Sequence, residues 1–145
     1  MADDRPPEID DEILAFAARM FDLARSGETA LLIEYVDAGL PVDLTNGVGD
    51  SLLMLAAYYD RAETVQALLE RGADTGRIND RGQTALAAAT FRRAADEVEL
   101  LLRAGADPCL GSPNAIEVAR FFEYPDMLEM LEAAVAGTPG DTADR

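Results

Sequence analysis

Paired carboxylates are the residues of this chain that most directly suggest chemistry. They occur at Asp96-Glu97 and in the run Asp10–Glu12. Two neighbouring carboxyl groups can act as general acid and general base when their surroundings separate their pKa values. Both sets lie where helices are expected to begin, however, and the helix dipole favours acids at such positions. We therefore expect no catalytic residue among them.

Other groups that perform catalysis or bind metals are scarce. The chain has no His, which excludes Ser–His–Asp and Cys–His catalysis and zinc sites with imidazole ligands. The lone Cys109 has no basic residue close in sequence to activate it, so an incidental thiol is the simpler interpretation. Gly47–Asp50 (GVGD) lacks the Lys and the Ser or Thr of a phosphate-binding loop. We expect no enzyme, no metal and no cofactor.

The composition is strongly acidic. Among 145 residues, 28 are Asp or Glu and 12 are Lys or Arg, which gives a net charge of −16, and every basic residue is Arg. This balance disfavours nucleic acid as a partner, because phosphate binding depends on clustered basic residues. No run of apolar residues is long enough for a membrane helix, and the acidic N-terminus is unlike a signal peptide. We expect a cytoplasmic monomer with no membrane association.

The chain repeats itself at a fixed spacing. Residues 46–78 align with residues 79–111, and 11 of the 33 aligned positions are identical. The identities fall on glycines and apolar positions such as Leu53/Leu86 and Val65/Val98. A period of this length predicts a solenoid, in which each unit buries its leucines only against its neighbours.

Each unit is predicted to fold as two short helices. Ser51 and Thr84 are expected to cap first helices over residues 51–59 and 84–91. Second helices are predicted over residues 62–71 and 96–104. The glycines that follow them, Gly72 and Gly105, are suited to the left-handed residue after a helix end.

The two units resemble ankyrin repeats. Gly49–Asp74 matches the family pattern GxTALxxA closely, Gly82–Asp107 matches it more closely still, and both end in a GAD turn. The resemblance implies an all-α ankyrin-repeat solenoid of stacked helix-turn-helix units joined by hairpin-like loops, which binds a protein partner. The family's usual Pro and His after the Thr are replaced in both units, so packing must substitute for the buried hydrogen bonds of that histidine.

The resemblance extends more weakly in both directions. We predict four repeats, the outer two degenerate, at about residues 15–45, 46–78, 79–111 and 112–136. They form a single domain over residues 10–136, between an acidic tail at 1–9 and a flexible tail at 137–145. One longer helix is predicted over residues 10–26, because its apolar residues keep a three-to-four spacing.

A partner-binding surface is expected at the ends of the first helices. In the family, these helix ends and the hairpin tips form a concave binding face. Here the corresponding positions carry five of the nine aromatic residues, namely Tyr58, Tyr59, Phe91, Phe121 and Phe122. Exposed aromatic side chains are frequent binding anchors. The alternative is that one ring of each pair packs between repeats, with Tyr59 and Phe122 the expected members to turn inward.

The hairpin tips provide the second recognition element. They are predicted at residues 44–50, 76–83 and 109–114. Val48 and Ile78 are apolar residues in otherwise polar loops, and each either contacts a partner or packs on the adjacent hairpin. The remaining predicted contact residues are Asp50, Arg81 and Gln83 at the tips and Arg92 at a helix end.

Two interpretations of the arginines near these aromatics remain open. The residues concerned are Arg61, Arg77, Arg81, Arg92, Arg93 and Arg120. They either form a basic island that takes a carboxylate from a partner, or they pair with Asp60, Asp80, Asp96 and Glu123. Exposed pairs of that kind contribute only ~0–1 kcal/mol.

The sequence thus supports two functions. The first is a non-catalytic interaction module that binds an intracellular protein through its groove and hairpin tips. The second is an acidic regulator or decoy that masks a basic, nucleic-acid-binding surface on a partner. The second function needs acidic residues concentrated on one face, and its affinity would fall steeply with salt. The absence of Lys beside many Ala, Arg and Gly also suggests a bacterial source with a GC-rich genome.

Overall fold

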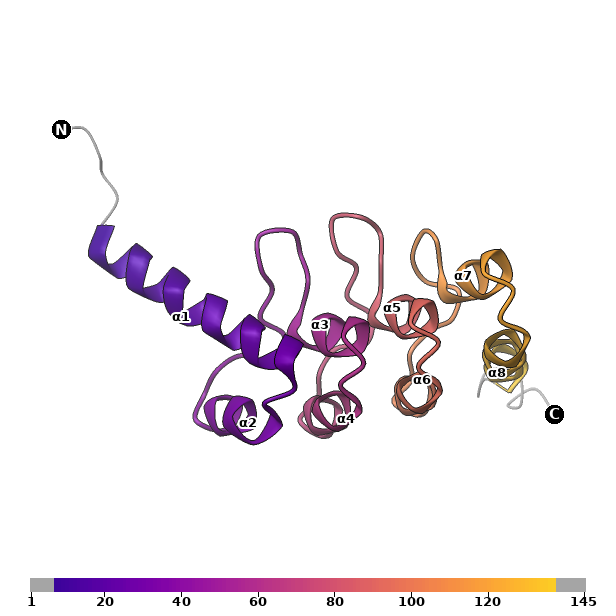
Figure 1. The fold of residues 1–145 in the computed structure, drawn as a ribbon, viewed down its shortest axis with the longest axis horizontal. Coiled ribbons are helices and arrows are strands. Elements are labelled where there is room, and N and C mark those ends of the chain that lie inside the picture. Colours follow the sequence, from indigo (N-terminus) through magenta and orange to yellow (C-terminus); the bar gives the residue numbers. More distant parts are fainter. Residues whose placement is uncertain (1–6, 138–145) are drawn as a thin grey trace.

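Eight helices make up residues 7–137, the part of the chain that this computed structural model describes. In chain order they are α1 (Pro7–Ser26), α2 (Thr29–Asp37), α3 (Leu52–Tyr58), α4 (Ala62–Glu70), α5 (Ala85–Phe91), α6 (Ala95–Arg103), α7 (Ala115–Phe121) and α8 (Pro125–Ala136). Figure 1 shows α1, α3, α5 and α7 in one row and α2, α4, α6 and α8 in a second. No strand occurs within this range, and the predicted all-α solenoid is confirmed.

The two rows are stacked so that each helix meets only its neighbours. Helix α3 packs between α1 and α5, and α5 packs against α7, while α4 and α6 follow the same order in the second row. The repeated apolar residues, among them Leu53, Leu86, Val65 and Val98, are buried at these contacts. This explains the repeat, because each unit needs the same apolar positions to cover the next one.

The predicted helix caps are confirmed. The Ser51 hydroxyl accepts a hydrogen bond from the backbone N–H of Met54 at 3.1 Å, and the Thr84 hydroxyl accepts one from Ala87 at 3.0 Å. Gly72 and Gly105 follow the second helices with φ of 85° and 97°. These residues fix where the short helices begin and end, and therefore place the ends of α3 and α5 side by side.

Helix α1 differs from the other first helices in its length. It begins at Pro7, three residues before the predicted start, since proline is well suited to the first position of a helix. Its N-terminal half extends past the stack (Figure 1), and Ile13 and Leu14 are exposed there. Most residues of the two predicted tails, 1–9 and 137–145, lie outside the described range.

The loops between the helix pairs are hairpins tied to one another. The Asn46 N–H donates to the Asp50 carbonyl at 2.9 Å, and the Asn79 N–H donates to the Gln83 carbonyl at 3.0 Å. Successive hairpins are joined by a bond from the Asp80 N–H to the Val48 carbonyl at 3.0 Å. The hairpins lie side by side and project from the row of first helices (Figure 1).

Candidate partner-binding surface

A continuous line of aromatic rings runs across the ends of α3, α5 and α7. We call it the aromatic row, and its members are Tyr59, Tyr58, Phe91, Phe122, Phe121 and Tyr124. Tyr58 and Phe91 are stacked with centroids 5.9 Å apart and an interplanar angle of 4°. Phe91 meets Phe122 edge-on at 5.4 Å. These separations fall in the range where aromatic pairs attract one another, so the row is held together across repeat boundaries.

All five predicted aromatics of the row are exposed. Tyr58, Tyr59, Phe91 and Phe122 each keep 39–41% of their accessible surface, and Phe121 keeps 78%. The expectation that Tyr59 and Phe122 turn inward is wrong. The reason is that the two rings of a pair meet edge-to-face, at 5.2 Å for Tyr58–Tyr59 and 4.9 Å for Phe121–Phe122, so each ring shields its partner in part and neither enters the core.

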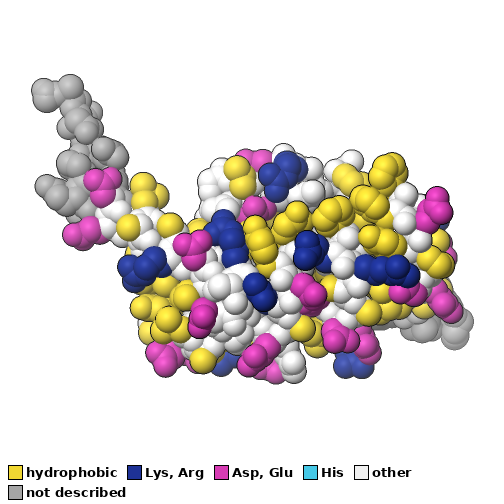
Figure 2. Space-filling view, in the orientation of Figure 1, with side chains coloured by type: hydrophobic (Ala, Val, Ile, Leu, Met, Phe, Trp, Pro, Cys, Tyr) yellow, Lys and Arg dark blue, Asp and Glu magenta, His cyan; other side chains and the backbone are white. Residues whose placement is uncertain are grey.

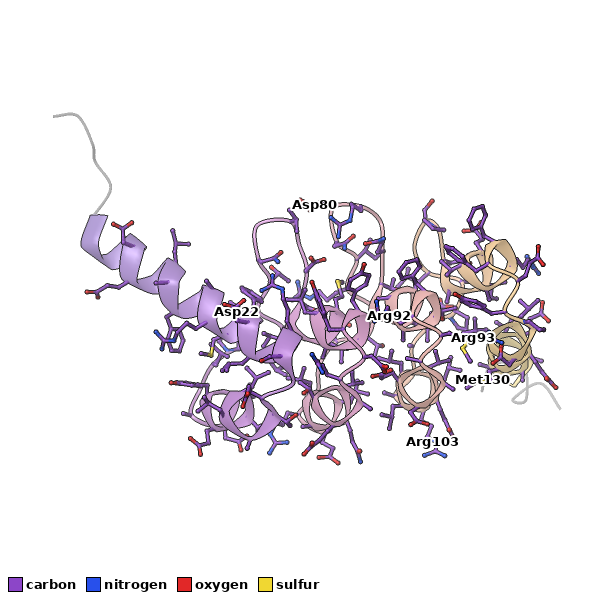
Figure 3. All side chains as sticks on the ribbon, viewed as in Figure 1. Asp22, Asp80, Arg92, Arg93, Arg103 and Met130 are labelled. Atoms are coloured by element: carbon purple, nitrogen blue, oxygen red, sulfur yellow. The ribbon has the colours of Figure 1, made fainter. Side chains whose placement is uncertain are left out.

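Two arginines lie over rings of the row. The guanidinium of Arg92 is 5.7 Å from the centre of the Tyr58 ring, and that of Arg93 is 4.8 Å from the centre of the Tyr124 ring. Figure 3 labels both arginines. At such separations a cation is attracted to an aromatic face by about 0.5–1 kcal/mol at exposed sites. The row therefore carries positive charge as well as apolar surface.

The ion pairs of these arginines differ from those considered in the sequence. Arg93 pairs with Asp126 at 3.1 Å, Arg120 with Glu132 at 3.3 Å and Arg81 with Asp50 at 4.0 Å. Arg77 pairs with Asp74 at 3.7 Å. The predicted partners Asp60, Asp80, Asp96 and Glu123 were wrong, because Arg81, Arg93 and Arg120 reach across to the adjacent hairpin or to α8, while Arg77 pairs within its own loop.

Arg92 and Arg61 are left without carboxylate partners among residues 7–137. Arg61 donates from Nε to the carbonyl of Arg25 at 2.7 Å, which fixes its side chain on the preceding repeat. The guanidinium of Arg92 has no hydrogen-bonded or ion-pair partner among the described side chains, and it lies over the Tyr58 ring. Its neighbour Arg93, in contrast, lowers the pKa of Asp126 through their hydrogen bond.

Two pockets adjoin along the row. The first has a volume of about 360 Å³ and is partly polar, with Arg25, Asp50, Asn79 and Arg81 in its wall. The second has a volume of about 230 Å³, and its wall is mostly apolar. Tyr58, Gln83 and Ala88 belong to both pockets. The surface is thus a groove with a polar part and an apolar part, which meet at these shared residues.

The predicted hairpin residues lie beside this groove. Val48 and Ile78 are both nearly half exposed, so neither is covered by the adjacent hairpin. Asp50 is held by a hydrogen bond from the Asn79 side chain at 2.7 Å, and the Gln83 carboxamide accepts from Arg81 Nε at 3.2 Å. Asp50, Arg81 and Gln83 all line the partly polar pocket, whereas Val48 and Ile78 line neither pocket.

The face of the molecule that carries the helix ends has a mixed surface. Figure 2 shows hydrophobic side chains gathered over its right half, with arginines among them. Many of the acidic side chains lie along the lower edge, over the second helix row. Since the whole chain carries −16, this gathering of arginines makes the helix-end face distinct from its acidic surroundings.

One carboxyl group is buried away from this surface. Glu97, in the first turn of α6, is fully buried, and neither of its oxygens has a hydrogen-bond partner in the described structure. Burial raises the pKa of Glu97 to about 8; the nearby side chain of Asp60 adds most of the remaining effect, and the charge of Asp96 adds less. Glu97 thus lies in the first turn of a helix, as the sequence predicts, but its side chain is buried and not exposed to solvent.

The remaining candidate residues for chemistry are not assembled into a site. Cys109 is exposed. No cluster of three or more side chains able to hold a metal occurs among the described residues. The helices of the same range include none with the length and apolar character needed to cross a membrane.

Sequence reasoning did not single out several residues of this surface, among them one ring of the row and two residues of the apolar pocket. Tyr124 extends the aromatic row, with its ring 5.8 Å from that of Phe122. Val118 and Pro113 form part of the apolar pocket. A signal existed for Tyr124, which follows Phe122 by two residues, but Val118 and Pro113 are recognisable only once α7 is placed beside α5.

Comparisons with known proteins agree with this architecture. The sequence model of the family described as ankyrin repeats (3 copies) matches residues 14–111. A protein of Pseudomonas aeruginosa, named as an ankyrin repeat protein, is 48% identical over 66 residues. That match covers 46% of this chain and 39% of the relative, so the chain corresponds to less than half of the relative's length.

Proposed function

Because the chain belongs to the ankyrin repeat family, whose members generally serve as protein–protein interaction modules, we propose that it binds a protein partner along the aromatic row. In this proposal the partner lies in the groove formed by the helix ends and the hairpin tips, and the module has no catalytic role. We further propose that it acts as a monomer in the cytoplasm, as its sequence predicts.

The observation that carries this proposal is the exposure of the aromatic row. Five rings at the ends of three successive first helices are exposed together, and they are continuous with a groove. Contiguous apolar surface of this kind on a folded protein usually marks an interaction site. Tyr, Phe and Arg are also the residue types enriched at protein interfaces.

The test is a triple substitution of exposed rings, Tyr58→Ser, Phe91→Ser and Phe121→Ser. Partners are first identified by affinity purification from the native cell and mass spectrometry, and binding is then measured with the purified partner. We expect the triple variant to lose at least about 100-fold in affinity, since central interface aromatics cost ~2 kcal/mol or more each when truncated. Circular dichroism must show that the variant remains folded.

A matched control replaces three exposed large hydrophobic residues elsewhere. Ile13→Ser, Leu14→Ser and Leu31→Ser alter exposed residues of α1 and α2, none of which lines the groove. This control should bind the partner as the wild type does. Equal affinity of the wild type and the aromatic triple variant for the partner would refute the groove assignment.

The decoy role is the second candidate, and the charge distribution on the visible face does not favour it. Acidic side chains there stand beside arginines and hydrophobic residues and do not form one uninterrupted patch (Figure 2). The salt dependence of binding separates the two roles, because a decoy for a basic surface would lose affinity steeply with added salt.

A further inference from the structure

The groove has two adjoining parts with different chemistry. Tyr58, Gln83 and Ala88 are shared by the apolar pocket and the partly polar pocket, so a single extended segment lying in the groove would enter both. What each part can accept follows from its volume and its walls.

The apolar pocket has room for one large side chain. Its walls come from Phe91, Phe122, Val118 and Pro113, and small alanines on α5 form its floor. Its volume of about 230 Å³ is below the range of roughly 300–1,000 Å³ that is typical of sites for free small molecules. A side chain of a partner, Leu or Phe in size, suits this pocket better than a free ligand.

The polar part offers guanidinium groups. Arg25 and Arg81 line the polar pocket, where Arg25 is already paired with Asp22 at 2.7 Å. Arg92 lies over the ring of Tyr58, a residue that both pockets share. Arg81 donates from Nε to the Gln83 carboxamide at 3.2 Å, and its nearest carboxylate oxygen, on Asp50, is 4.0 Å from its guanidinium. Arg92 has no carboxylate partner among the described residues, so its donors are available to a bound group.

A carboxylate is the group that binds such guanidinium groups best. Arginine presents its donors as a planar fork that matches a carboxylate in bidentate fashion. The net charge of −16 does not prevent this, because charges farther away than about 8 Å are largely screened at physiological ionic strength. At contact distance the arginines determine the local interaction.

We propose that the groove binds an extended peptide segment in which a large apolar residue stands next to Asp or Glu. The apolar side chain occupies the pocket between Phe91 and Val118, and the carboxylate contacts Arg92, with Arg25 and Arg81 close by. This inference rests on the proposed function and specifies the chemistry of the partner at the same groove.

The experiment begins with peptide selection. Random linear peptides displayed on phage are selected on the immobilised full chain, and the enriched sequences are read. The expected result is enrichment of Leu or Phe next to Asp or Glu. One enriched peptide, labelled with fluorescein, then gives dissociation constants by fluorescence anisotropy for the wild type and for variants.

Two charge reversals form a matched pair of variants. Arg92→Glu should weaken the labelled peptide at least about tenfold, as expected when a charge-assisted contact becomes a repulsion. Arg103→Glu, on the outer helix α6 (Figure 3), makes the same charge change away from the groove and should leave the affinity within about threefold. A peptide with Lys in place of its acidic residue should recover affinity for Arg92→Glu.

Each contrary outcome has a separate meaning. Peptides that lose affinity for Phe91→Ser but bind Arg92→Glu as tightly as wild type would overturn the acidic requirement and leave the proposed function standing. Peptides that are insensitive to both substitutions would place the binding surface elsewhere and refute the groove as well. A selection without any enriched sequence would overturn the peptide proposal, whereas the aromatic triple variant tests the groove independently.

Discussion

Glu97 occupies in α6 the position that Thr64 occupies in α4, and both side chains are fully buried, but only Thr64 has a hydrogen-bond partner. The Thr64 hydroxyl lies 2.6 Å from that of Thr29, which ties the second helix pair to the first. The carboxyl oxygens of Glu97 have no such partner among the described residues. In α8 the same position is held by Met127, also buried. The site between repeats thus suits neutral groups, and Glu97 fits it when it is protonated.

A pH-dependent stability follows from this burial. The pKa of Glu97 is raised from 4.5 to about 8 in the folded chain. Between these values the unfolded chain has released the proton and the folded chain retains it, so the free energy of unfolding falls as the pH rises and levels off above about 8. We expect Glu97→Gln to remove this contribution and to stabilise the protein at pH 8 by on the order of a few kcal/mol. Urea denaturation at about pH 5 and pH 8 measures it.

The neighbouring exposed acid provides the control. Asp96→Asn removes one carboxylate from the same helix turn, and its pH profile should keep most of the slope of the wild type. Comparing the dependence of stability on pH among the wild type and the two variants separates the contribution of Glu97 from the general repulsion among acidic residues, which all three proteins share. Parallel profiles for Glu97→Gln and the wild type would show that Glu97 is ionised in the folded chain.

The side chain of Asn79 is predicted to be essential for the order of the hairpin tips. Its carboxamide oxygen accepts from the backbone N–H groups of Arg81 and Gln83, both at 2.9 Å. Its NH₂ group reaches across to Asp50 on the preceding hairpin at 2.7 Å. Asn79→Ala should destabilise the chain by about 1–3 kcal/mol, because two part-buried backbone donors and the Asp50 carboxylate lose their partner. Thermal unfolding and amide exchange across residues 76–83 measure the loss.

Asn46 is the matched position for that test. It closes its own hairpin through the N–H groups of Val48 and Asp50, but it is only partly buried and makes no bond to another hairpin. Asn46→Ala should therefore cost less than Asn79→Ala. The reverse order would mean that the contact between hairpins contributes little.

The turns between paired helices predict a stabilising substitution. Asp60, Arg93 and Glu123 adopt left-handed backbone angles there, with φ of 63°, 55° and 58°, where the first pair has Gly27 at 78°. Left-handed backbone is unfavourable for residues with a Cβ atom. Glu123→Gly is expected to raise the free energy of unfolding by at most about 1 kcal/mol, after the greater flexibility of glycine in the unfolded state is subtracted. Chemical denaturation measures the change.

Glu123→Ala distinguishes backbone relief from the loss of charge. It removes the same carboxylate and keeps the Cβ atom, so it should give none of the gain. If both variants stabilise the protein equally, the effect comes from reduced repulsion among acids and not from the backbone.

Local sequence signals predicted the helices, their caps and the stacking order. Ser51, Thr84 and the two GAD turns act on residues next to them in the chain, so a single sequence is sufficient to interpret them. The aromatic positions were found in the same way, because the repeat places Tyr58 and Phe91 at equivalent helix ends. A repeated sequence pattern therefore predicts the same local structure in each unit that carries it.

The burial of single side chains and the ion-pair partners were not predicted, because they depend on how neighbouring repeats pack against each other. Asp96 and Glu97 are adjacent acids in one helix turn, yet one is exposed and the other is buried, because they point to different sides of α6. The arginine partners were mistaken for the same reason. Asp126 lies on α8, and only the packing of α7 and α8 against α5 and α6 brings it to Arg93.

The aromatic row crosses the boundaries between three helix pairs, and this has a consequence for motion. In a stack whose units touch only their neighbours, the end pair can open without disturbing the others. A partner bound across Tyr58, Phe91 and Phe122 would make opening of α7 and α8 less favourable, because opening them would also require releasing the partner. Bound and free molecules should then differ most in the exchange of amide hydrogens at the C-terminal end of the stack, far from the middle of the groove.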